Sequence, residues 1–183
     1  MKYGAVLIAV ASLGLISASP SRQLPSMAQT ADTAFMMGCN LHVIGASSID
    51  EKNKSALEKE GIFVTEDGVP EDLRANSIKE LGTPVFARMD SASGYVWISA
   101  YPNSAACTVT ATTGETAQIF DEVTKSIDAD GSFWRLVKNG SSISTGVLAR
   151  TYMLSLDNGL KGGLMIKATT SAAAGNSNKF ALI

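Results

Sequence analysis

The stretch from Gly94 to Ile127 constrains the fold of this chain more than any other part of the sequence. It predicts a strand over Tyr95 to Tyr101, a second strand over Cys107 to Ala111, and an amphipathic helix over Glu115 to Ile127. In both strands small or aliphatic side chains alternate with aromatic or polar ones, which is typical of a strand with one buried face. The apolar stripe of the helix, with the spacing expected for packing against a sheet, consists of Ala117, Phe120, Val123 and Ile127.

Helical and strand patterns flank this stretch on both sides. Apolar residues three or four apart predict a first helix from about Met27, and a capping-box pattern at Ser48 predicts a second helix that ends at Gly61. Pro70 suits the first position of a third helix. Alternation predicts further strands over residues 84–89, 133–138, 147–156 and 160–169. Because short turns join antiparallel strands, we expect an α+β fold: an antiparallel sheet of about six strands, with the N-terminal helices and one central helix packed on one face.

The N-terminus predicts export. Lys2 precedes an apolar run from Ala5 to Ile16, and small residues follow it, as in a secretory signal peptide that is cleaved after Ala18. The run has 12 residues, whereas a membrane-spanning helix needs roughly 20. No basic stop-transfer flank follows, which disfavours the alternative of an uncleaved membrane anchor. Cys39 lies too far beyond the run to be the cysteine of a lipoprotein.

These features divide the chain into a signal peptide (1–18), a linker (19–27) and a single globular α+β domain (28–183). Cleavage after residue 18 leaves 165 residues, a common size for one domain. Within the domain, the small polar residues near 171–178 predict a mobile stretch.

The charge of the mature chain does not favour a nucleic acid as partner. Cleavage removes Lys2 and no acidic residue, which leaves 14 basic and 17 acidic residues and a net charge of −3. Nucleic-acid-binding surfaces need concentrated Lys and Arg, and the basic aromatic segment at 133–138 alternates like a strand of the sheet core. We therefore expect no nucleic acid partner and no transmembrane segment after signal cleavage.

The chain contains two cysteines, Cys39 and Cys107. In an exported protein two cysteines most simply form one disulfide, which here would close a long loop and stabilise the fold by about 3–5 kcal/mol. A metal site is the alternative, because Cys39 and His42 have ligand-like spacing and Cys107 could supply a third ligand. His42 is the only histidine and no second pair completes a tetrahedral set, so the sequence favours the disulfide and predicts no metal.

The sequence contains no recognisable catalytic motif. A Ser-His-Asp or Cys-His mechanism would depend on His42, which helical spacing places on the buried face of the first helix. There is no P-loop, no Gly-x-Gly-x-x-Gly and no nucleophile elbow. Carboxylates such as Asp121, Glu122, Asp128 and Asp130 remain, but we expect them on the solvated side of the central helix. We therefore predict no catalytic residue and no cofactor, which favours a protein that is not an enzyme.

One aromatic face of the predicted sheet is a candidate binding surface. Tyr95, Trp97 and Tyr101 share a face of their strand. If the helices cover the opposite face, these side chains are available to a partner or a ligand, whose binding surfaces are often aromatic. The alternative is that they pack under a loop or a second layer of helices.

Taken together, these features resemble a loose group of small exported proteins of Gram-negative bacteria. The resemblance covers roughly Phe35 to Ile127. It rests on a helix with one cysteine (Cys39), a strand with Trp97, and the Cys107-Thr108-Val109 strand before an amphipathic helix. It implies a periplasmic location and a disulfide, and it implies no particular activity.

The sequence therefore predicts an exported domain, periplasmic or secreted, that is not an enzyme and binds an envelope or extracellular protein. A pocket between sheet and helices for a small ligand or a lipid is the second hypothesis. A hydrolase that uses a carboxylate pair is the third.

Overall fold

A computed structural model describes residues 23–75, 77–113, 116–129, 134–139, 147–155, 161–169 and 180–182. Within these ranges the chain forms two four-stranded antiparallel sheets with helices, which confirms the α+β class. The expectation of one sheet of about six strands is wrong, because β1 and β8 add to the expected strands and the set divides into two sheets. The predicted signal peptide, residues 19–22 of the linker and the 171–178 stretch lie outside the described residues.

The first sheet has the order β1-β2-β3-β4. Its strands are β1 (Phe63–Val64), β2 (Val85–Ser91), β3 (Gly94–Tyr101) and β4 (Ala106–Ala111). Ala87, Ile98 and Val109 lie side by side in the register, so the aliphatic side chains of three strands share one face. That face is buried, as the alternation in the sequence predicts.

A continuous helical segment covers this face. It consists of α1 (Met27–Thr33), the π-helical η1 (Ala34–Asn40) and α2 (Leu41–Val43). Ser26 caps α1 through a capping box with Gln29. The residues predicted to face inward are all buried, namely Ala31, Ala34, Phe35, Gly38, Cys39 and His42. A Cβ atom on Gly38 would lie 2.8 Å from Cδ1 of Ile98, so the missing side chain allows the helix to approach the sheet closely.

The second sheet follows α5 (Thr116–Ala129). It has the order β5-β6-β7-β8, with β5 (Trp134–Asn139), β6 (Val147–Ser155), β7 (Lys161–Thr169) and β8 (Phe180–Leu182). In α5 the predicted stripe is buried except for Ala117, which is exposed. The helix also buries Thr116, Ile119 and Thr124.

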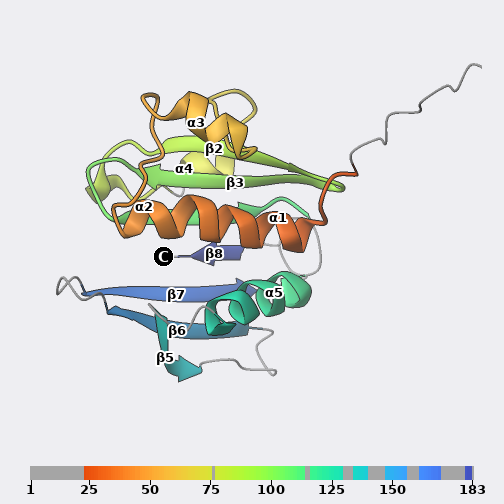
Figure 1. Ribbon diagram of the computed structural model, residues 1–183, viewed down its shortest axis with the longest axis vertical. Coiled ribbons are helices and arrows are strands. Elements are labelled where there is room, and N and C mark those ends of the chain that lie inside the picture. The colour runs from red at the N-terminus through yellow and green to blue at the C-terminus, as the bar shows by residue number, and fades with distance from the viewer. Residues whose placement is uncertain are drawn as a thin grey trace, which may run out of the picture.

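The two sheets meet edge to edge, because β8 also lies beside β4. The helices α1 and α5 pack against each other on the same side of the sheets (Figure 1). Each half of the chain thus contributes three successive antiparallel strands, β2 to β4 in the first half and β5 to β7 in the second.

The remaining helices are shorter than predicted and differ in position. The second predicted helix is reduced to α3 (Lys54–Lys59), and the third to α4 (Glu71–Ala75) and the 3₁₀ turn η2 (Lys79–Leu81). The α4–η2 segment lies on the opposite face of the first sheet, behind β2 and β3 in Figure 1. The expectation that all N-terminal helices pack on one face is therefore wrong for this segment.

Two long-range contacts fix η1 to both sheets. Cys39 of η1 and Cys107 of β4 form the predicted disulfide, with 5.4 Å between their Cα atoms. Asn40 accepts a buried hydrogen bond of 3.1 Å from the indole N–H of Trp134 in β5. The π-helical segment is thus bonded to the first sheet and to the second.

Candidate functional site

The predicted aromatic surface is mostly inaccessible. Tyr95, Trp97 and Tyr101 share one face of β3 as expected, but Trp97 and Tyr101 are each 1% exposed whereas Tyr95 is 46% exposed. The α4–η2 segment explains the burial of Tyr101, whose hydroxyl accepts a hydrogen bond of 2.7 Å from the N–H of Ile78. Only Tyr95 of the three is available to a partner in this structure, and its role in binding stays a prediction.

Tyr95 does not stand alone on this face. The guanidinium of Arg88 lies 4.6 Å from the centre of the Tyr95 ring, within the range of a cation–π contact. Arg88 also forms an ion pair with Asp90, at 3.2 Å. These contacts hold the exposed ring at the end of β2 and β3.

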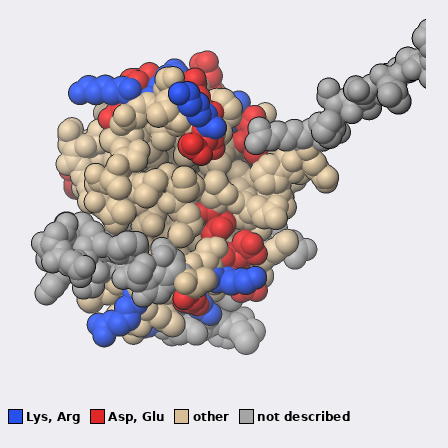
Figure 2. Space-filling model, in the orientation of Figure 1, with Lys and Arg blue, Asp and Glu red and all other residues tan. Residues whose placement is uncertain are grey.

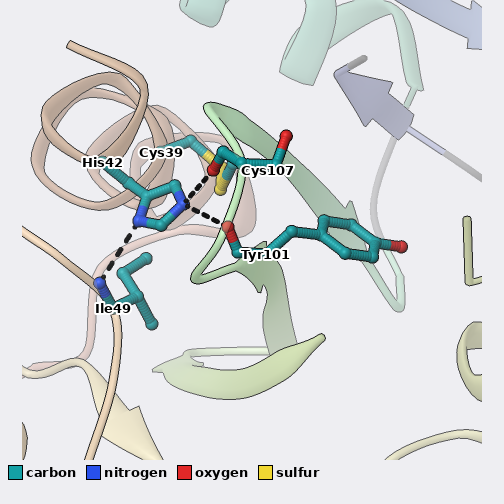
Figure 3. Close-up of a disulfide and its surroundings, with 6 residues drawn as sticks. Cys39, His42, Ile49, Tyr101 and Cys107 are labelled. Atoms are coloured by element: carbon teal, nitrogen blue, oxygen red, sulfur yellow. Dashed lines mark hydrogen bonds between the residues drawn. A yellow bond between two sulfur atoms is a disulfide. The ribbon is translucent and has the colours of Figure 1, made fainter. Parts of the chain in front are cut away.

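The single histidine is held by backbone groups. Nε2 of His42 lies 3.2 Å from the carbonyl oxygens of Tyr101 and Ser104, and Nδ1 accepts a hydrogen bond from the N–H of Ile49 (Figure 3). This pattern assigns the ring proton to Nε2. His42 therefore ties α2 to the loop between β3 and β4, as its predicted position on a buried helix face suggests.

The metal-site alternative at Cys39, His42 and Cys107 is not supported. Both cysteine sulfurs are in the disulfide, and both nitrogens of His42 have backbone neighbours. Among the residues that the structure describes, no group of three His, Cys, Asp or Glu side chains could hold a metal ion.

The acidic residues of α5 occupy different environments. Asp121 is exposed. Asp128 accepts hydrogen bonds from Arg150 at 2.7 Å and from the hydroxyl of Tyr152 at 3.0 Å. Burial raises the pKa of Tyr152, and the hydrogen bond to Asp128 and its negative charge also raise it, which keeps the phenol protonated. This network fastens α5 to β6, and Asp130 lies outside the described residues.

A pair of carboxylates lies between α1 and α5. Asp32 of α1 faces Ser126 and Glu122 of α5. Burial raises the pKa of Asp32, the hydrogen bond from Ser126 lowers it, and the charge of Glu122 raises it further; the net direction is upward. Oδ1 of Asp32 is inaccessible and has no hydrogen-bond partner within the described part of the chain. The negative charge of Asp32 is thus unfavourable in the folded protein.

We expect Asp32→Asn to raise the urea midpoint of unfolding at pH 7. The pKa of folded Asp32 lies above its usual value of 3.8, so the native protein loses stability as the pH rises through that raised pKa. The advantage of the variant should therefore disappear below about pH 4, where both states carry the protonated acid. Asp121→Asn is the matched control, because this neighbouring acid is exposed. Equal midpoints for the two variants at pH 7 would contradict the prediction.

The solvent side of the α1–η1–α2 segment is almost uncharged. Between Met27 and Gly45, Asp32 is the one residue with a formal charge at neutral pH. The exposed or half-buried side chains next to it are mostly apolar, and we call five of them the helix face: Thr33, Met36, Met37, Leu41 and Ile44. In Figure 2 this region is mostly tan, with charged side chains above it and acidic side chains (red) at its lower edge. A surface helix normally carries charged residues on its solvent side, so the helix face is unusual.

A groove of about 480 Å³ adjoins the helix face. Thr30 and Thr33 of α1 form one wall, and Glu58 to Gly61 form the other at the end of α3. Met89 and Asp90 of β2 also line it, with the exposed side chains of Leu24 and Phe63. Thr33 belongs to both surfaces, so the groove opens onto the helix face.

Sequence reasoning missed these two surfaces. The lack of charge between Met27 and Gly45 is visible in the sequence, but the same apolar composition is expected of a helix that is buried on all sides. The structure shows that Met37 is 43% exposed, and this exposure distinguishes a surface from a core.

No helix within the described ranges is both long and apolar enough to cross a lipid bilayer. Comparison with known proteins finds no matching family, no similar curated protein and no similar solved structure.

Proposed function

We propose that this chain is an exported domain, periplasmic or secreted, that is not an enzyme and binds a polypeptide of the envelope or of the extracellular medium. The observation that carries the proposal is the uncharged helix face with the exposed Met37. Methionine is enriched in protein interfaces, where its flexible side chain adapts to a partner. The disulfide is compatible with an oxidising compartment.

The chemistry of the described residues supports binding over catalysis. His42 bonds to backbone groups through both ring nitrogens, and both cysteines are oxidised. The carboxylate of Asp128 is bonded to Arg150 and Tyr152. These side chains have structural partners, whereas the side chain of Met37 on the helix face is 43% exposed.

Photo-crosslinking at Met37 tests the proposal. A benzophenone amino acid at this position, in the chain exported by its own host, should form an adduct with another polypeptide. Met153 of β6 is the matched control, since it is also methionine and also 43% exposed. Absence of an adduct at Met37, or equal adducts at both positions, would contradict a specific binding surface.

A small ligand is the second candidate partner. The volume of the groove falls within the range of about 300–1,000 Å³ that is typical of small-molecule sites. Native mass spectrometry of the chain from its own host distinguishes this function, because a carried ligand adds its mass to that of the polypeptide.

A further inference from the structure

The outer edge of β2 is paired along part of its length. Phe63 of β1 lies opposite Arg88, and the N–H of Thr65 donates to the carbonyl of Phe86 at 3.0 Å. Beyond the strand, the N–H of Ala92 donates to the carbonyl of Pro25 at 2.9 Å. Between these two contacts lies Asp90.

The backbone of Asp90 points away from β3. Backbone groups of alternate residues in a strand face the same edge, so those of Asp90 face the same side as those of Phe86, toward β1. On the other side, Tyr95 lies opposite Asp90, but its carbonyl accepts from the N–H of Thr112 next to β4. The N–H and carbonyl of Asp90 therefore face the groove, and no backbone group in the described residues pairs with them there.

The edge is open because the chain turns away before β1. Gly61 has a φ of +78°, a conformation that side-chain-bearing residues rarely adopt. The N–H of Ile62 donates to the carbonyl of Leu57 in α3. The residues that precede Phe63 thus belong to α3 and do not continue alongside β2. The edge of β2 at Asp90 is therefore open to the groove.

The side chains that line the groove beside Asp90 are apolar or charged. Leu24 is 51% exposed and Phe63 is 39% exposed. Glu58 and Glu60 line the groove with Lys59 between them, and neither glutamate has an ion pair within the described part of the chain. The carboxylate of Asp90 is paired with Arg88, so the remaining charges that line the groove are those of Glu58, Lys59 and Glu60, with an excess of one negative charge.

From this arrangement we propose that the groove binds an extended, basic segment of a partner polypeptide by strand addition to β2. One residue of the segment exchanges hydrogen bonds with the backbone of Asp90. An apolar side chain packs against Leu24 and Phe63, and two flanking Lys or Arg side chains pair with Glu58 and Glu60. The free N–H and C=O of Asp90 favour a peptide backbone over an acyl chain, because only the peptide can both donate and accept a hydrogen bond. Three residues of strand, about 10 Å, span the open edge.

This inference rests on the proposed function and specifies the chemistry of the partner. NMR titration of the ¹⁵N-labelled mature protein with acetyl-Lys-Val-Lys-amide tests it. We expect the Asp90 amide to shift and to exchange more slowly with solvent, whereas acetyl-Glu-Val-Glu-amide should leave it unchanged. Because two exposed ion pairs are lost, the variant E58Q/E60Q should raise the Kd for the basic peptide about fivefold.

The outcomes separate this inference from the proposed function. If neither peptide shifts the Asp90 amide, or if both shift it equally, the strand-addition site is wrong. An adduct at Met37 together with an unresponsive Asp90 would keep the binding function and overturn the groove chemistry. A responsive Asp90 without an adduct at Met37 would keep the groove and overturn the helix face as a binding surface.

Discussion

Replacing both cysteines, as C39A/C107A, is expected to lower the free energy of unfolding by about 4 kcal/mol. The disulfide joins residues 68 positions apart, so in the reduced unfolded chain a long loop gains conformational freedom. The bond also holds η1 against β4 of the first sheet. Its loss therefore removes a restraint in the core of the fold.

Urea unfolding measures this effect, with the wild type in a thiol reductant as an independent comparison. Cys39 and Cys107 are 2% and 6% exposed, so reduction should need partial unfolding, and the reduced wild type should then match the double variant. Labelling of the unfolded, unreduced wild type should find no free thiol. Two reactive thiols, or an unchanged midpoint in the variant, would overturn the prediction.

Trp97→Ala is expected to destabilise the fold by about 3–5 kcal/mol, as large-to-small substitutions of buried aromatic residues do. Trp97 is 1% exposed and lies between Arg88 and Thr110 in the register of the sheet. Truncation leaves a cavity on the face of β3 that also carries the buried ring of Tyr101.

Tyr95→Ala is the control, because it removes an aromatic side chain from the same face. That ring is 46% exposed and contacts Arg88, so its loss should cost less than about 1 kcal/mol. Thermal unfolding of the two variants measures the difference, and similar losses in both would contradict the burial of Trp97. Loss of binding in the Trp97 variant would accordingly report unfolding, while loss in a stable Tyr95 variant would report a contact.

Local patterns predicted much of this fold, because they reflect short-range geometry. The alternation in β3 and β4 identified the buried face with Ile98 and Val109, and the helical spacing from Ala31 to His42 identified the inward residues. The disulfide followed from the number of cysteines and the expected compartment. These predictions needed no knowledge of how distant segments meet.

The features that the sequence could not predict depend on contacts between segments that lie far apart in the chain. The hydrogen bond from Trp134 to Asn40 joins residues 94 positions apart, and no local pattern couples them. The position of the α4–η2 segment, which buries Tyr101, is likewise determined by tertiary packing. The same holds for β8, which places a C-terminal strand beside β4. The candidate surfaces depend on these long-range contacts, because the contacts determine which apolar residues remain exposed.

The attachment of η1 has a consequence for the entropy of association. Its inner side is bonded covalently to β4 and through Asn40 to β5, so the helix backbone has little freedom left to lose. Met37, on its outer side, is 43% exposed and keeps the rotamers of a long unbranched side chain. A polypeptide that docks on this helix meets a rigid backbone with adaptable side chains. The conformational entropy lost on association then comes from a few side-chain torsions of methionine and from the ordering of the partner.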